Sequence, residues 1–357
     1  MKPCLEKPYT KFSDMYSGPL LRALPHLSLG RTVYDVLQRY YDAETLRTCF
    51  CFQTKYLGMS PWECPGAFAM IPFIEHEFGV EHVRGGLSEI SRAMARVVEE
   101  HGGKIYLDTP VKQVVTTAGC ATGVHLENGE TVVADAVIVN ADFAHAMNTL
   151  FAPGTLRKYT RTRLDRMKYS CSTFMLYLGL DKLYDDPHHT IYFAGDYHAN
   201  IDDITRHKRL TEDCSFYVRN ASITDSTLAP EGKSAVYVLV PAPNTTGNVD
   251  WERERAPMRD RVLALIKERT SMKDIDDHIE VEQCVTPADW IARDVYFGAT
   301  FNLAHTLTQM LYFRPRNRFE ELKNCYLVGG GTHPGSGLPT IYESGRISAN
   351  LLTEDCN

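Results

Sequence analysis

YLVGGGTHPGSGLPTIYESGR, residues 326–346, is the stretch that decides the fold of this 357-residue chain. An apolar run precedes it, five glycines lie between Gly329 and Gly337, and a helix-like pattern follows. Glycine lets a backbone approach a ligand closely, and proline suits a first helical turn. The N–H groups of that turn and the helix dipole favour negative charge. Glycine spacing alone leaves two readings open, a ligand-binding loop and a plain tight turn.

Composition restricts the classes of function. The chain is long enough for two domains, and 44% hydrophobic with 23% charged residues is ordinary for a globular protein. A net charge of −7 without a basic block argues against nucleic-acid binding. The ten cysteines form no CxxC pair, which favours buried thiols in a cytosolic protein over disulfides. His188 and His189 are adjacent and are expected to diverge within a loop, so no metal site is predicted.

Residues 84–142 have the pattern of an α/β unit. Apolar residues recur at helical spacing in 84–103, which predicts a helix with one apolar face: Leu87, Ile90, Met94, Val97 and Val98. KIYLDTPVKQVV (104–115) is expected to be a strand, and GVHLENGETVVA a hairpin that turns at Asn128-Gly129. DAVIVNAD (135–142) is apolar almost throughout, which predicts a strand buried on both faces.

The rest of the chain divides into a sheet-rich region and a return to α/β order. CSTFMLYLGL and SAVYVLVPAP predict strands, and PMRDRVLALIKER predicts an amphipathic helix. CYLV, the glycine loop and PTIYESGRISANLL then predict strand, loop and helix. Two separate segments of the chain are therefore expected to form one α/β domain, with another region inserted between them. The predicted domains are substrate-domain helices (1–85), the middle of a cofactor domain (86–142), a substrate-binding domain (143–304), and the C-terminal part of the cofactor domain (305–357).

GGGTHPGSGLPTIYESGR resembles the C-terminal signature of the carotenoid desaturases of the bacterial and fungal phytoene (or diapophytoene) desaturase type. RGGLSEISRAMARVVEEHGG, NADFAHA, DSTLAPEGKSAVYVLVPAPN and LTQMLYFRPRNR are similar to further stretches of that family, in the same order. The resemblance implies an α/β fold, a glutathione-reductase-like FAD-binding fold with a substrate domain of sheet plus helices. It also implies an oxidoreductase that acts on CH–CH groups, desaturating a long polyisoprenoid in carotenoid biosynthesis.

The resemblance also implies site residues. Arg22, in LLRALPHL, falls where the family carries an arginine with an acid–base or charge-stabilising role, and a solvated helix arginine is the alternative. His333 is expected beside the flavin ring, or else it only shapes the turn. The expected FAD-binding residues are Val111, Gly330, Gly331, Thr332, His333, Pro334, Gly335, Gly337, Leu338, Pro339 and Thr340.

The family opens with a βαβ unit whose GxGxxG loop holds the FAD pyrophosphate. Nothing before Gly85 has that pattern, so the chain is expected to be truncated at its N-terminus, or else to take this unit from a partner polypeptide. The isolated chain is therefore expected to bind FAD poorly, to be inactive, and to leave sheet edges and apolar faces exposed.

Bilayer-resident substrates imply a cytoplasmic protein that associates peripherally with membranes. Residues 17–41, apolar with interspersed arginines, are a candidate interfacial segment, and packing inside a domain explains the same pattern. Alternatives to desaturation are a carotenoid isomerase, an oxidase or a retinol saturase relative of the same fold, a soluble amine oxidase, and a non-catalytic isoprenoid-binding fragment. The substrate length, C30 or C40, and the electron acceptor stay open.

Overall fold

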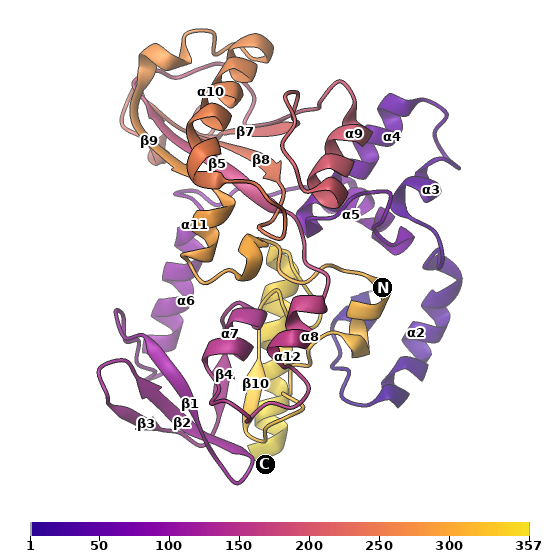
Figure 1. The fold of residues 1–357 in the computed structure, drawn as a ribbon, viewed down its shortest axis with the longest axis vertical. Helices are drawn as coiled ribbons and strands as arrows, with labels where there is room; N and C mark the ends of the chain where they lie inside the picture. Colours follow the sequence, from indigo (N-terminus) through magenta and orange to yellow (C-terminus); the bar gives the residue numbers. More distant parts are fainter. Residues whose placement is uncertain (1, 357) are drawn as a thin grey trace. The chain divides into compact units, whose positions relative to one another are not determined.

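The computed structural model describes residues 2–356, which form two compact units. The first unit comprises residues 2–77, 108–170 and 293–356, and the second comprises residues 78–107 and 171–292. Each unit is therefore assembled from segments far apart in the sequence, as the ribbon colours in Figure 1 make visible. The predicted domains divide the chain into cofactor-binding and substrate-binding parts, whereas the two units are defined by internal contacts. The assignment of ligands to parts of the chain stays a prediction.

The first unit holds most of the short helices and two small sheets. Its regular elements are α1 (Lys2–Leu5), α2 (Gly18–Ala23), α3 (Val33–Leu37), α4 (Glu44–Cys51), α5 (Met70–Phe78), β1 (Val111–Thr117), β2 (Cys120–Leu126), β3 (Thr131–Val133), β4 (Val137–Val139), α7 (Phe143–Thr149), α8 (Arg161–Arg166), β10 (Cys325–Leu327) and α12 (Leu338–Cys356). Strands β1, β2 and β3 form an antiparallel sheet, while β10 runs parallel to β4. The expected hairpin is confirmed, with Gly129 at φ +90° in its turn.

Two strand predictions in this unit need correction. Residues 104–110 are not a strand, and β1 begins only at Val111, where it pairs with Leu126 of β2. A strand is defined by ladder pairing, and none of the strands described within residues 2–356 forms a ladder with 104–110, although the carbonyl of Pro110 accepts the N–H of Glu127. Strand β4 buries Val137 and Val139 but leaves Ile138 46% exposed, so it is covered on one face only.

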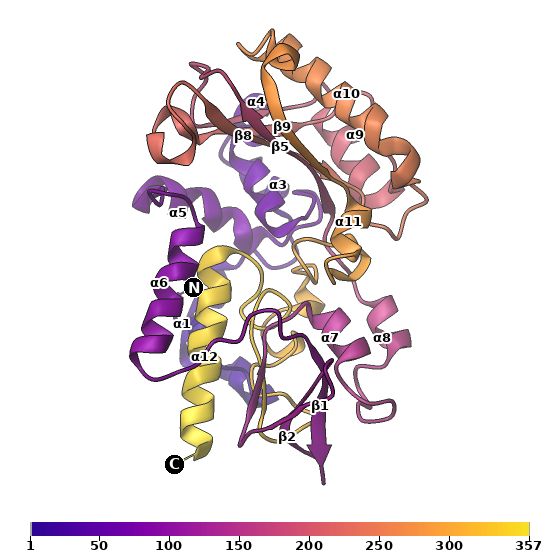
Figure 2. The ribbon, with the colours of Figure 1, turned by 90° about the vertical axis from the view of Figure 1, so that its left-hand side faces the viewer.

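The second unit is built on a five-stranded antiparallel sheet in the order β6-β7-β8-β5-β9. Its elements are α6 (Ser88–Glu100), β5 (Ser172–Leu180), β6 (His189–Tyr192), α9 (Tyr197–Asp202), β7 (Phe216–Asn220), β8 (Ser234–Ala242), α10 (Trp251–Arg269), β9 (Ile279–Val285) and α11 (Pro287–Ile291). Helix α10 covers one face of the sheet (Figures 1 and 2). The predicted strands 171–180 and 234–243 and the predicted helix within 251–269 are thereby confirmed.

Alternation along the strands explains this core. Phe174, Leu176 and Leu178 of β5 point to the same face and pack with Val262 and Ile266 of α10. Each such side chain contributes about 1.5–3 kcal/mol on burial, relative to an exposed position. The second unit therefore has a hydrophobic core of its own.

Helix α6 is confirmed as a helix, but its apolar face is not covered. Leu87, Met94, Val97 and Val98 are between 44% and 60% exposed, and α6 has no buried residue.

Two further sequence expectations concern His188 and membranes. The rings of His188 and His189 do not diverge: they stack at 4.1 Å because Thr224 holds His188 and Tyr217 holds His189 by hydrogen bonds. No group of three metal-ligating side chains occurs within residues 2–356. In the same part of the chain, none of the helices combines the length and apolarity that crossing a bilayer requires.

Candidate flavin-binding loop

The candidate site lies where β4 and β10 end. The two strands are parallel, with Leu327 opposite Val139, so both chains leave the pair at the same edge. Residues 328–337 form the loop after β10, and α12 begins directly behind it. A side chain on Gly329 would come within 3.2 Å of Asn140 Oδ1, which shows how closely the two strand ends approach. This edge is the usual place for ligands in open α/β sheets.

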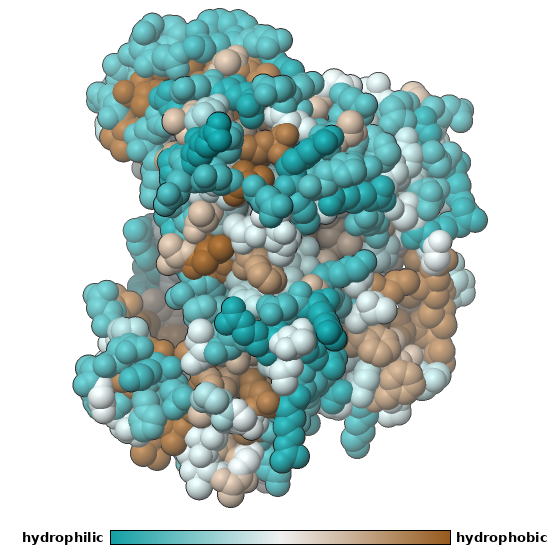
Figure 3. All heavy atoms as spheres, viewed as in Figure 1, coloured by the Kyte–Doolittle hydropathy of each residue, from teal (hydrophilic) through white to brown (hydrophobic). Residues whose placement is uncertain are grey.

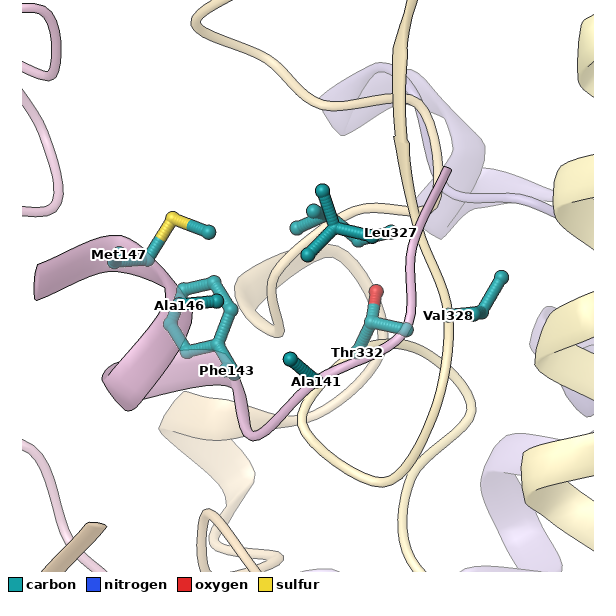
Figure 4. Close-up of a pocket in the computed structure, with 8 residues that line it drawn as sticks. Ala141, Phe143, Ala146, Met147, Leu327, Val328 and Thr332 are labelled. Carbon is teal, nitrogen blue, oxygen red and sulfur yellow. The ribbon is translucent and has the colours of Figure 1, made fainter. Parts of the chain in front are cut away.

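The loop needs glycine at defined positions. Gly329, Gly335 and Gly337 have φ values of +99°, +139° and +112°, which residues with a Cβ rarely adopt. At Gly331 a Cβ would sit 2.3 Å from Phe143 Cβ, so this glycine serves close packing on α7. Figure 4 shows Phe143, Ala146 and Met147 of α7 facing Leu327 and Thr332. The cavity between them is about 10 Å³, room for about one water molecule.

Arg314 fixes the shape of the loop from beneath. Its guanidinium is fully buried and donates to the carbonyl oxygens of Gly330 (2.6 Å) and Thr332 (3.1 Å). It also donates to the carbonyls of Leu303 and Gln309, at 3.1 and 3.0 Å. Burial lowers the pKa of Arg314 to about 9, so it stays charged at neutral pH. Within residues 2–356 no carboxylate is hydrogen-bonded to it, so the loop rests on an uncompensated positive charge.

His305 supports the second half of the loop. Its Nε2 accepts a hydrogen bond from the backbone N–H of Ser336 at 3.1 Å, which assigns the ring proton to Nδ1. The ring is 2% exposed, and burial together with the charge of Arg314 holds the pKa of His305 well below its ordinary value. A Cβ on Gly335 would lie 2.2 Å from this Nε2. The imidazole can occupy this position only because residue 335 has no side chain.

Helix α12 is tied to the loop by buried hydroxyl and amide groups. Ser344 Oγ accepts from the N–H of Gly329 at 2.8 Å, and Ser348 Oγ donates to the carbonyl of Leu327 at 2.7 Å. The amide of Asn317 donates to the carbonyls of His333 and Ser344 and to Ser348 Oγ. Strand end, loop and helix are therefore held as one body.

The first turn of α12 opens to the surface. Leu338 and Pro339 are exposed, and Thr340 Oγ1 donates to the carbonyls of Ser336 and Gly337, at 2.8 Å each. The exposed backbone at this helix start, together with the charge of Arg314 behind the loop, suits an anionic group. A flavin carries negative charge at its N1–C2=O edge when reduced, so the residues present fit that group. Gly330 and Gly337 are partly exposed and offer backbone against which a flat ring can lie. Gly331 and Gly335 are instead buried against Phe143 and His305.

Of the remaining predicted residues, Val111 and Arg22 lie outside this loop, whereas His333 belongs to the loop but has a buried side chain. Val111 opens β1 and is 40% exposed. Arg22 is exposed on α2, and its only hydrogen bond within residues 2–356 goes to the carbonyl of Gly18 in its own helix. The His333 ring is buried edge-on against Tyr9 at 5.0 Å, and burial lowers the pKa of His333 to about 4. The roles of Arg22, Val111 and His333 stay predictions.

Sequence reasoning missed Arg314, His305 and Asn317. The segment 307–318 was recognised as the lead-in to the loop, but no spacing rule distinguishes a structural arginine from a solvated one. The sequence gives no signal that singles them out, because Arg316 and Arg318 lie in the same polar stretch as Arg314 and Asn317.

The sequence model of the family described as "Flavin containing amine oxidoreductase" matches residues 5–353. The chain is 54% identical over 353 residues to a 4,4'-diapophytoene desaturase (4,4'-diapolycopene-forming) of Methylomonas sp, covering 99% of this chain and 69% of the relative. It is 42% identical to an all-trans-zeta-carotene desaturase of Myxococcus xanthus, covering 95% of this chain and 64% of that relative. The chain thus spans about two thirds of the length of these curated relatives.

Solved structures agree with this at the level of the fold. An oxidoreductase from Methanosarcina mazei superposes with a TM-score of 0.63 at 17% identity, over 96% of this chain and 73% of that one. A variant of putrescine oxidase gives a TM-score of 0.59 at 12% identity, over 98% of this chain and 71% of that one.

Proposed function

Because the chain belongs to the family of flavin-containing amine oxidoreductases, we propose that it acts in the FAD-dependent desaturation of a long polyisoprenoid such as diapophytoene or phytoene. The observation that carries the proposal is the loop of residues 328–337, a backbone surface held over the buried charge of Arg314 and continued by an open helix start. The desaturase names of the two relatives support the same reaction class.

The chemistry that FAD supplies when bound is acceptance of a hydride from an allylic-adjacent carbon, while a proton leaves the neighbouring carbon and a C=C bond forms. Gly330 and residues 336–340 are the ones that would hold the flavin ring by backbone contacts. Arg314 keeps the loop in place and adds positive charge behind it. Arg22 lies on α2, where it would stabilise charge that develops in the substrate.

The pyrophosphate end of FAD needs a second glycine loop, which residues 1–85 do not contain. We infer that a further polypeptide segment, in the same protein or in a partner, supplies that loop. The exposed apolar face of α6 and the exposed Tyr106 and Leu107 support this, since such surfaces are normally covered.

The decisive experiment combines FAD titration with product analysis. The purified chain is titrated with FAD, first alone and then with the part of the Methylomonas relative that this chain does not cover added, and incubated with diapophytoene or phytoene in liposomes. We expect weak FAD binding alone, tight binding after addition, and products whose visible absorption moves to longer wavelength as double bonds are added.

Other outcomes separate the alternatives. A saturated FAD complex that changes only double-bond geometry would indicate an isomerase, and added oxygen would indicate an oxidase. Binding of the substrate without turnover in the FAD-loaded protein would contradict the proposal and favour an isoprenoid-binding protein. Tight stoichiometric FAD binding by the chain alone would overturn the inference of a missing pyrophosphate loop.

A peripheral association with membranes is the second part of the proposal. Long polyisoprenoids dissolve in bilayers rather than in water, so an enzyme that takes them up must meet the lipid surface. Flotation with liposomes tests this independently of turnover, and a protein that stays wholly in the unbound fraction would contradict it.

A further inference from the structure

Six large apolar side chains lie exposed around α2 in the first unit. They come from α2, the 3₁₀ turns at Phe12–Tyr16, Leu24–His26 and Leu311–Phe313, and the turn after Leu27. Their exposed fractions run from 40% to 64%. The set, called the apolar surface below, consists of Phe12, Tyr16, Leu21, Leu24, Leu29 and Phe313.

Ring contacts join part of the apolar surface, including residues far apart in sequence. The Phe12 ring contacts the rings of Tyr16 and Phe313, with centroids 5.9 and 6.4 Å apart. Leu21 and Leu24 are three residues apart on a helical path, which places them on one side. Figure 3 shows the brown and tan atoms of this region gathered over α2.

The apolar surface is distinct from the core beneath it. Leu20 and Leu27 are 3% and 8% exposed and pack with Tyr9 in a buried cluster. Helix α2 therefore has one apolar side inside the unit and another turned outward. In the later part of the candidate interfacial segment 17–41, α3 buries Val33 and Leu37, whereas Tyr40 is 75% exposed.

In the segment that carries most of the apolar surface, exposed cations outnumber acidic side chains. Lys11, Arg22 and Arg31 are exposed, and the one acidic residue between Lys11 and Arg31 is Asp14. The Asp14 carboxylate is engaged by the backbone N–H groups of Thr10 and Lys11, at 2.8 Å each. This locally positive rim contrasts with the net charge of −7 of the whole chain.

We propose that the apolar surface inserts into the headgroup region of a bilayer that carries anionic lipids, with Lys11 and Arg31 facing the lipid phosphates. Exposed aromatic and leucine side chains among cations are what an interfacial membrane anchor requires. A second copy of the chain is a poorer occupant, since it would bring two positive rims together. The inference deepens the proposed function by naming the docking surface, and it rests on that function only for the reason why docking is useful.

Flotation of the protein as purified tests the inference without FAD or substrate. Vesicles of phosphatidylcholine alone are compared with vesicles that contain phosphatidylglycerol as well. The variants are the pair Phe12→Ser with Leu21→Ser, and the pair Lys11→Gln with Arg31→Gln. Matched controls are Val281→Ser, which removes an apolar side chain that is 67% exposed in the second unit, and Arg96→Gln, which removes an exposed charge from α6. Thermal melting checks that every variant is folded.

The apolar pair is expected to weaken partitioning onto anionic vesicles by about tenfold or more. Each lost cation is expected to weaken it by about fivefold on anionic vesicles and hardly at all on neutral ones. The two controls should match the unsubstituted protein. Partitioning that is absent from anionic vesicles, or that falls equally in the controls, would overturn the proposal. Failure of desaturation with intact flotation would instead count against the proposed function alone.

Discussion

The pairing of Gly335 with His305 gives a prediction whose size follows from the geometry. In Gly335→Ala the new Cβ would start 2.2 Å from His305 Nε2, far inside van der Waals contact. The ring cannot swing away freely, because it is 2% exposed and accepts the Ser336 N–H. Overpacking of this kind costs about 1–3 kcal/mol, and a φ of +139° adds about 1 kcal/mol for any residue with a Cβ. We expect a loss of about 3 kcal/mol in the free energy of unfolding.

Gly154→Ala is the matched control for this substitution. Gly154 lies in the same unit with φ +82°, and an added Cβ would have nothing within 4 Å. It should therefore cost only about 1 kcal/mol, the backbone part of the effect. Urea unfolding of both variants, followed by tryptophan fluorescence and circular dichroism, measures the difference.

A double-mutant cycle with His305→Ala isolates the steric part. His305→Ala alone removes the acceptor of the Ser336 N–H and leaves a cavity, so it should destabilise by about 3 kcal/mol. In the double variant the clash is absent, and the two losses should sum to about 2 kcal/mol more than the loss observed. Additive losses, or Gly335→Ala as mild as Gly154→Ala, would refute the reasoning that ring and glycine require each other.

Three further predictions follow from single side chains. Arg314→Met should lower the free energy of unfolding by about 3 kcal/mol, because four carbonyls lose their donor. Its melting temperature should therefore fall more than that of any exposed arginine variant. Calorimetry that finds no change would contradict this. The hydroxyl of Thr227 holds the pKa of Asp225 below its ordinary value, so the stabilisation by Asp225 is present above about pH 4 and is lost as the pH falls further. Urea midpoints at pH 6 and pH 3 should therefore differ less in Asp225→Asn than in the unsubstituted protein. Val97→Glu on the open face of α6 should change the unfolding free energy by less than about 0.5 kcal/mol, whereas Val262→Glu inside α10 should abolish folding, both judged by circular dichroism.

The fold is predictable where a strand-forming pattern and the strand that pairs with it both lie within this chain. The hairpin at Asn128-Gly129 needs only its two flanking strands, and β5 and β8 find each other in the sheet of the second unit. The strand prediction for residues 104–110 was wrong for the opposite reason: their short apolar run is compatible with a strand, but none of the strands described within residues 2–356 forms a ladder with it. Ile138 was expected to be buried because residues 135–142 are apolar almost throughout, but it is 46% exposed.

The candidate site was predictable only as a backbone feature. Glycine spacing and Pro339 indicate a loop that opens a helix, and the structure has that loop. The side chains that hold it are invisible to such rules, because Arg314 and His305 act through carbonyl and N–H groups that any residue carries. Adjacent histidines were expected to diverge, yet His188 and His189 stack, since hydrogen bonds to other strands set their rotamers.

The amide of Asn317 and the hydroxyls of Ser344 and Ser348 have a consequence for how this loop can change over evolutionary time. The Asn317 amide donates to Ser348 Oγ and to the Ser344 carbonyl, and the two hydroxyls bond the N–H of Gly329 and the carbonyl of Leu327, inside a region closed to water. A replacement at one position leaves a polar group stranded, unless a second replacement follows. Among related chains, these three positions should therefore drift together or not at all, and a homologue that differs at one of them should differ at its neighbour as well.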